Sequence, residues 1–115
     1  MNIAIIAAAG ALNYSLVDKK INEIIEETQN YAICILCGFI KGKESDEETL
    51  GEKWAKANGA PIRWVHAKTD TALMDAMILK ADYAIFVLDG NPLINQAFMR
   101  YKMAGKHGAV IKTNI

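Results

Sequence analysis

Hydrophobic residues occur along the chain in five short runs. Each run is apolar at most of its positions and contains several Ile, Val, Ala or Leu residues. Such runs are typical of strands in a parallel sheet that helices cover on both faces. We therefore expect β-strands at Asn2–Ala9, Tyr31–Cys37, Ile62–His66, Tyr83–Leu88 and Ala109–Lys112.

The segments between these runs repeat hydrophobic residues at helical spacing, with charged residues on the opposite side. In the first segment, Ser15 with Asp18 resembles a capping box. Gly59 is the expected left-handed residue at the end of the second helix, and Asp70 is the expected N-cap of the third. The four helices are expected at Leu16–Ile25, Ser45–Asn58, Thr71–Lys80 and Pro92–Gly105.

Strands and helices thus alternate along the whole chain, with short connections. This alternation predicts an α/β fold in which right-handed crossovers place helices on both faces of the sheet. We expect a three-layer, Rossmann-like sandwich with a five-stranded parallel sheet and about four helices. With 115 residues, the chain fits a single domain over residues 1–115.

Composition narrows the classes of partner. Thirteen Lys and Arg balance thirteen Asp and Glu, so the formal net charge is zero. General nucleic-acid binding is not expected, because it requires a basic face. No apolar run reaches the roughly 18–20 residues needed to span a bilayer, so we expect no membrane association. Met1–Gly10 lacks the basic leader of a signal peptide.

Cys34 and Cys37 form a CxxC pattern inside a predicted strand. Residues three apart on a strand point to opposite faces, so the two thiols are not placed to share a metal ion or a disulfide. We expect no metal site. Two buried thiols agree with a reducing compartment, which predicts a cytoplasmic protein.

Ligands of open parallel sheets bind beyond the carboxyl ends of the strands. Glycine at such a position lets the backbone approach a ligand, although glycines are equally common at turns that bind nothing. Gly10, Gly38 and Gly90 have this position. The candidate loops are Ala8–Asn13, Gly38–Glu48, His66–Asp70 and Asp89–Asn95.

Several side chains in these loops could contribute chemistry. Lys41 and Lys43 could contact a phosphate, or they could be solvated residues of a long loop. His66 ends the third strand and could act as an acid or base, although a lone histidine is usually structural. Asp89 ends the fourth strand. Trp54 on the second helix is expected to pack against the sheet.

One segment resembles a known family. The sequence Glu48–Ala55 (ETLGEKWA), followed by Asn58–Ile62 (NGAPI), is similar to the "G-A-D-x-L-G-x-x-W-A…G-I-P" segment of the YspA/cpYpsA-like group. That group belongs to the SLOG superfamily, which includes the Lonely Guy and DNA-processing proteins. Asn13–Val17, the spacing of Met77 and Asp82, and the pair Asp89-Gly90 also agree with the family pattern.

The resemblance implies a Rossmann-like domain that binds or processes nucleotides or nucleotide-derived ligands. The enzymes of the superfamily cleave N-glycosidic bonds with a glycine-rich phosphate loop and a glutamate after "G-G-x-G-T". This chain instead reads Asn91–Gln96 (NPLINQ), without Gly-Thr and without a glutamate, and Glu48 occupies the usual aspartate position. A glycosidase needs a carboxylate beside the developing oxocarbenium charge. We therefore expect binding with weak or no catalysis.

Three hypotheses remain. In the first, the chain binds a nucleotide-like small molecule, without a further cofactor. In the second, it is an N-glycosidase or phosphoribohydrolase-type enzyme with Glu47, Glu48 or Asp89 as the carboxylate and His66 as the acid. In the third, it is a non-catalytic oligomeric subunit, because related domains often self-associate and Trp64 lies on an expected edge strand. The expected ligand contacts are Gly10, Asn13, Gly38, Lys41, Lys43, Gly90 and Asn91.

Overall fold

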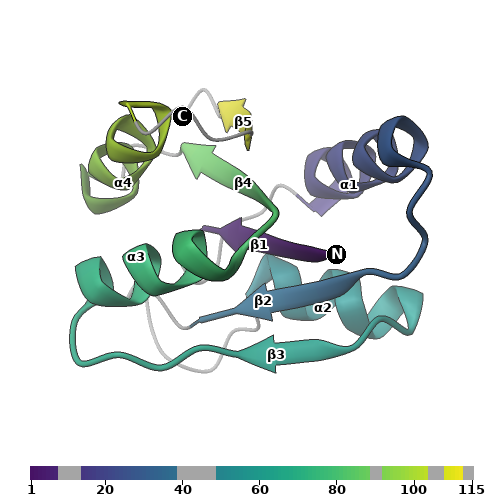
Figure 1. Ribbon diagram of the computed structural model, residues 1–115, viewed down its shortest axis with the longest axis horizontal. Helices are drawn as coiled ribbons and strands as arrows, with labels where there is room; N and C mark the ends of the chain where they lie inside the picture. Colours follow the sequence, from purple (N-terminus) through teal and green to yellow (C-terminus); the bar gives the residue numbers. More distant parts are fainter. Residues whose placement is uncertain (8–13, 39–48, 89–91, 104–107, 113–115) are drawn as a thin grey trace.

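The computed structural model describes residues 1–7, 14–38, 49–88, 92–103 and 108–112 (Figure 1). Five strands and four helices alternate along it. They are β1 (Asn2–Ile6), α1 (Tyr14–Thr28), β2 (Cys34–Cys37), α2 (Leu50–Asn58), β3 (Ile62–Trp64), α3 (Asp70–Lys80), β4 (Tyr83–Leu88), α4 (Pro92–Met103) and β5 (Gly108–Lys112). The predicted α/β class, with a parallel sheet and four helices, is confirmed.

The strands form one sheet in the order β3-β2-β1-β4-β5, and every neighbouring pair is parallel. Ile3 of β1 pairs with Ile35 of β2 on one side and with Tyr83 of β4 on the other. The first strand therefore lies in the centre of the sheet. The connections run outward from β1 to β3, return to β4 and continue outward to β5, so the strand order reverses between β1 and β4 (Figure 1).

The sheet has a hydrophobic core on each face because successive strand residues point to opposite sides. Ile3 and Ile5 lie in a core that includes buried residues of α1 and α2. Ala4 and Ile6 lie in a second core that includes buried residues of α3 and α4. Two helices thus cover each face of the sheet (Figure 1). Among the described residues, no helix combines the length and hydrophobicity needed to cross a bilayer.

Three strands are shorter than predicted. The first ends at Ile6, so Ala7 lies outside it, and the predicted strand residues 8–9 lie outside the described part of the chain. The second begins at Cys34 instead of Tyr31, because the Asn30 side chain accepts a hydrogen bond from the Ala32 amide (3.0 Å) and holds this segment in a turn. The third ends at Trp64 instead of His66. The amide of the next residue, Val65, donates to the Cys37 carbonyl, and Cys37 is the last residue of the neighbouring strand.

The helix N-caps also differ from the prediction. The second helix begins at Leu50, with Thr49 as its N-cap, instead of at Ser45, which lies outside the described residues. The N-cap of α3 is Thr69, whose hydroxyl accepts from the Ala72 amide, while Asp70 lies in the first turn. In both cases a threonine precedes the helix and can accept the free amide three residues later.

The predicted capping box of the first helix is wrong. Ser15 is the second residue of α1, not a residue before it, and the Asp18 carboxylate accepts a hydrogen bond from the Trp54 indole instead. The end of α2 is as predicted. Gly59 has a φ of +66°, which glycine adopts without steric cost, and its amide donates to the Ala55 carbonyl.

Candidate functional site

The carboxyl edge of the sheet is where all five strands end and where a ligand site is predicted. Ile6 pairs with Phe86, so the ends of the two central strands are neighbours at the point where the strand order reverses. Open parallel sheets bind ligands at such a reversal. The segments that follow these two strands, 8–13 and 89–91, lie outside the described residues.

Most of the predicted site residues fall in these segments or in 39–48. They are Gly10, Asn13, Lys41, Lys43, Glu48, Asp89, Gly90 and Asn91. Their roles therefore stay predictions. The structure describes the two remaining candidates, Gly38 and His66. It also describes the residues on either side of the segments 8–13, 39–48 and 89–91.

Gly38 is buried at the end of β2, beneath α3. A Cβ atom at this position would lie 2.8 Å from Leu73 Cδ1 and 2.9 Å from Met77 Sδ. Both distances are shorter than an ordinary van der Waals contact, so a side chain at position 38 would displace the helix residues above it. Glycine at this position thus lets the Leu73 and Met77 side chains of α3 pack directly on the end of β2. Its contact with a ligand stays a prediction.

His66 is exposed and follows β3, the edge strand. Three strand spacings separate β3 from β4, which corresponds to about 14 Å across the sheet. The structure therefore does not bring His66 next to the end of β4, where Asp89 follows. A ligand in contact with both positions would have to extend along the carboxyl edge.

Cys37 and Thr49 lie on either side of the segment 39–48, and their side chains are hydrogen-bonded to each other. Thr49 is 6% exposed, and its hydroxyl accepts a hydrogen bond from the Glu52 amide (3.2 Å). Burial raises the pKa of the Cys37 thiol to about 12, although a hydrogen bond from the Thr49 side chain acts in the opposite direction. Cys37 is therefore a protonated, unreactive core residue at neutral pH.

The two cysteines differ in surroundings, as their strand position predicts. Cys37 lies in the core shared with α1 and α2. Cys34 has the same strand parity as Leu36, which lies in the core on the other face, and it is half-buried at the start of β2. Within the part of the chain that the structure describes, no group of three His, Cys, Asp or Glu residues could hold a metal ion.

The motif that carries the family resemblance forms the buried face of α2. The buried residues of this helix are Leu50, Gly51, Trp54 and Ala55. A Cβ on Gly51 would lie 3.2 Å from Cys37 Sγ and 3.3 Å from Ile5 Cβ, so the helix backbone lies close to the sheet. These residues position the helix, and all four are buried against the sheet.

Trp54 packs against the sheet as predicted, and only 4% of it is exposed. Its indole nitrogen donates to Asp18 Oδ1 at 2.8 Å, which links α2 to α1. The sequence pattern did not predict this role of Asp18. A buried indole usually finds a hydrogen-bond acceptor, but its spacing of 36 residues from Asp18 gives no local signal.

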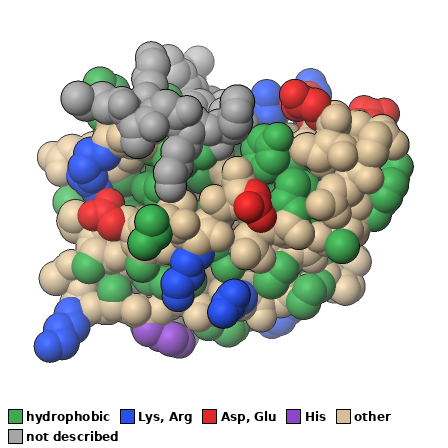
Figure 2. Space-filling view, viewed as in Figure 1, with side chains coloured by type: hydrophobic (Ala, Val, Ile, Leu, Met, Phe, Trp, Pro, Cys, Tyr) green, Lys and Arg blue, Asp and Glu red, His purple; other side chains and the backbone are tan. Residues whose placement is uncertain are grey.

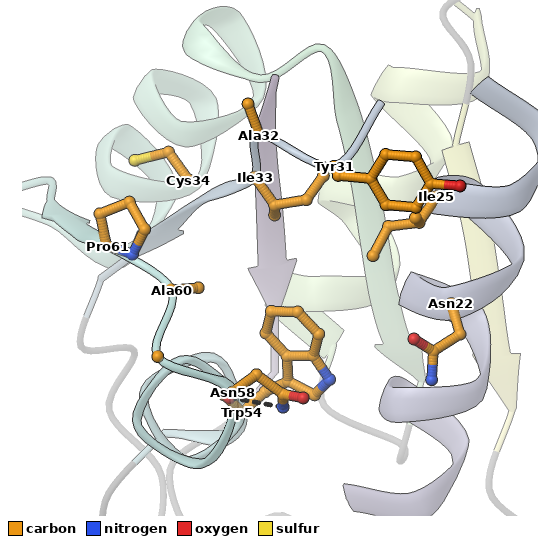
Figure 3. A pocket seen from close by; sticks show the side chains of 11 residues that line it. Asn22, Ile25, Tyr31, Ala32, Ile33, Cys34, Trp54, Asn58, Ala60 and Pro61 are labelled. Carbon is orange, nitrogen blue, oxygen red and sulfur yellow. Dashed lines mark hydrogen bonds between the residues drawn. The ribbon is translucent and has the colours of Figure 1, made fainter. Parts of the chain in front are cut away.

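A pocket lies at the opposite, amino edge of the sheet, between the ends of α1 and α2 (Figure 3). Its volume is about 560 Å³. Asn22 lines it from α1, Asn58 from α2, and Tyr31 from the turn before β2. The sequence did not predict ligand contacts for this pocket, because turn residues before a strand and polar residues on a helix have no distinctive pattern.

Charged side chains are mixed on the face of the molecule in Figure 2. Lys, Arg, Asp and Glu side chains of the described residues lie among hydrophobic and neutral ones, without a continuous basic patch on that face. The fold and its two edges define the chain as an α/β protein with an open parallel sheet. Comparison with protein-family models and with curated proteins finds no match to this chain.

Proposed function

We propose that the protein is a SLOG-like, Rossmann-type domain that binds a nucleotide or nucleotide-derived ligand at the carboxyl edge of its sheet, with little or no catalysis. The observation that carries this proposal is the reversal of strand order between β1 and β4, which is where open parallel sheets bind such ligands. The sheet order β3-β2-β1-β4-β5 is also that of the first five strands of dinucleotide-binding sheets.

The direction of the helices supports an anionic ligand at this edge. Each helix follows a strand and therefore begins toward the carboxyl edge, where its free amides and positive dipole end favour a phosphate. In α2 and α3 the N-cap threonine accepts only one of these amides, from Glu52 and Ala72 respectively. In this proposal, Lys41 and Lys43 supply the cationic contacts to the phosphate, and Gly10, Gly90 and Asn91 supply backbone approach.

The test is a thermal-shift panel of nucleoside mono-, di- and triphosphates, with mass spectrometry of the native protein for a copurified ligand. We expect one nucleotide to raise Tm by several degrees. Lys41→Ala or Lys43→Ala should weaken binding of that nucleotide about tenfold to a hundredfold, since a charged hydrogen bond contributes about 1.5–3 kcal/mol. Lys80→Ala, at the opposite end of a helix, removes the same charge and should leave binding unchanged. The absence of any shift across the panel would contradict the proposal.

The enzyme hypothesis has its own measurement. An enzyme would release free base from a nucleoside monophosphate, and Glu48→Gln or Asp89→Asn would abolish this release. That result would favour the glycosidase hypothesis over binding alone. We expect no release. His66→Ala separates the roles further, since an acid at that position would be needed for turnover but not for binding.

A second candidate function, assembly with further copies of the chain, is favoured by Trp64. This residue is 44% exposed on β3, an edge strand whose outer backbone groups have no strand partner in the described sheet. Light scattering of the purified protein gives its oligomeric state. Trp64→Ser should dissociate an assembly that uses this edge and should leave the nucleotide response intact.

A further inference from the structure

The pocket at the amino edge contains groups that fit a ligand of a different kind. It lies between the last turns of α1 and α2, and the turn before β2 forms part of its wall (Figure 3). Its volume of about 560 Å³ is within the range of small-molecule sites. None of the residues that line it carries a formal charge at neutral pH.

Two side-chain amides line this pocket from opposite helices. The Asn22 amide has no hydrogen-bond partner among the described residues and is exposed. The Asn58 amide donates to the Trp54 carbonyl (2.9 Å), which leaves its oxygen and one N–H without a partner in the described part of the chain. Each amide therefore has both a donor and an acceptor to offer to a ligand.

The apolar walls of the pocket suit a flat ring. Trp54 is 4% exposed and fixed by its hydrogen bond to Asp18, and Ile33 is 7% exposed, so both are held in place by the core. Pro61 adds a rigid apolar side. The Tyr31 side chain, which is 75% exposed, is the one aromatic ring at the pocket that can move to cover a ligand.

The electrostatics of this edge disfavour an anion. Both α1 and α2 end here, and the carboxyl end of a helix has a partial negative charge. The last turn of α1 contains no basic residue, and Lys56 in the last turn of α2 is paired with Glu52 at 3.2 Å. Among the residues that the structure describes, the Asp18 carboxylate accepts from Trp54 and the Met1 ammonium donates to the Ala32 carbonyl, so the charges beside the pocket have opposite sign.

We propose that this pocket binds an uncharged planar heterocycle with a neighbouring hydrogen-bond donor and acceptor, such as a free nucleobase. A paired donor and acceptor is what an asparagine amide recognises on a base edge, with both atoms in one plane. The apolar walls and Tyr31 contact the faces of the ring. This site is separate from the proposed nucleotide site, and its occupation does not depend on that function.

The test uses the intact chain with Trp64→Phe, so that Trp54 is the single tryptophan of the two in the sequence. Adenine, cytosine and uracil are titrated to concentrations on the order of 1 mM, which detects weak binding. At least one base should change the Trp54 fluorescence in a saturable way. Its nucleoside monophosphate should bind more weakly, because the phosphate would face the helix ends.

Substitutions then identify the amides. Asn22→Ala should weaken binding of the base about threefold to tenfold, since one neutral hydrogen bond is lost. This substitution leaves the fold intact, because the Asn22 side chain bonds to no described residue and alanine favours a helix. Asn58→Ala should give a similar loss. Asn95→Ala, an exposed asparagine on α4, is the matched control and should have no effect.

The outcomes separate the two sites. The double variant Lys41→Ala/Lys43→Ala should keep the full affinity for the base even if it loses the nucleotide. The proposal fails if no base gives a saturable response, or if Asn95→Ala weakens the base as much as Asn22→Ala. In the Lys41→Ala/Lys43→Ala variant, a base that changes the Trp54 fluorescence with lower affinity than its monophosphate does would also overturn the proposal, since the ligand would then be held at this pocket through its phosphate.

Discussion

The two edges of the sheet differ because of the direction of the backbone. Helices begin toward the carboxyl edge, where free amides favour an anion, and α1 and α2 end at the amino edge, where free carbonyls do not. The predicted nucleotide site lies among helix starts, with free amides. The pocket lined by Asn22 and Asn58 lies among helix ends, with free carbonyls. The comparison teaches that βα units create two chemically distinct ends before any functional side chain is added.

The largest expected effect on stability concerns Trp54, which is buried beside the amino-edge pocket. Trp54→Ala removes a side chain that is 4% exposed and its 2.8 Å hydrogen bond to Asp18. We expect the free energy of unfolding to fall by about 3–5 kcal/mol. Urea denaturation measures this change. Trp64→Ala, at a half-exposed position, should cost less than about 1 kcal/mol. Equal losses of stability in the two variants would mean that the packing and the hydrogen bond of Trp54 do not stabilise the contact between α1 and α2.

Two glycines, one at each edge, test different physical limits. At the carboxyl edge, Gly38→Ala should cost about 1–3 kcal/mol, because its Cβ would lie 2.8 Å from Leu73. At the amino edge, Gly59→Ala should cost about 1 kcal/mol, because Gly59 has a positive φ that alanine adopts only with strain. Crowding plays no part there, since a Cβ at position 59 would meet no described atom within 4 Å.

Asparagine distinguishes these two causes. It tolerates a left-handed backbone, so Gly59→Asn should recover most of the loss. At position 38 the larger side chain should cost more than alanine does. Thermal unfolding without ligand measures the stability of the alanine and asparagine variants at both positions. If Gly38→Ala lowered nucleotide affinity without lowering stability, the glycine would serve a ligand and not the contact with α3.

The smallest effect at neutral pH concerns the two cysteines, one at each end of β2. Cys37 has a folded-state pKa of about 12, above its ordinary value of 9.0, mainly because of burial. Its contribution to stability is complete below pH 9 and is lost as pH rises toward 12, with a slope of at most about 1.4 kcal/mol per pH unit. Cys37→Ala should flatten the decline over this range. Curves that stay parallel to those of the unsubstituted protein would contradict this assignment.

Thiol labelling sharpens the same contrast at neutral pH. Cys34 is half-buried and lines the amino-edge pocket, so a thiol reagent should modify it first. Cys37 should react only after unfolding. The Cys34 side chain lies on the face of the sheet opposite α1 and α2, so a base bound between these helices should leave its labelling rate unchanged.

Much of the fold could be predicted from the sequence because backbone physics decides it locally. The run Tyr83–Leu88 is apolar throughout and forms β4 with the predicted bounds. The boundaries failed where a single side chain intervenes: Asn30 holds the chain in a turn before β2, and Thr49 and Thr69 are N-caps in place of the expected residues. Such local hydrogen bonds compete with regular structure and have weak sequence signals.

The candidate sites were less predictable. The family resemblance rests on residues that pack α2 against the sheet, Gly51 and Trp54 among them, so it bears on architecture more directly than on chemistry. The amino-edge pocket depends on Asn22 and Asn58, which are 36 residues apart and meet only through the tertiary fold. No periodic pattern relates such residues, since each is an ordinary polar position on its own helix.

The central place of β1 has a consequence for the order in which the protein folds. Ile3 and Tyr83 are partners in the sheet, and the Asn2 amide donates to the Asp82 carboxylate, so the first strand acquires its second neighbour only after some 80 residues have been made. The face of β1 that carries Ala4 and Ile6 is covered by α3, which is made just before β4, and by α4, which is made after it. Such distant pairings slow folding, and we expect the nascent chain to need protection from aggregation until β4 emerges from the ribosome.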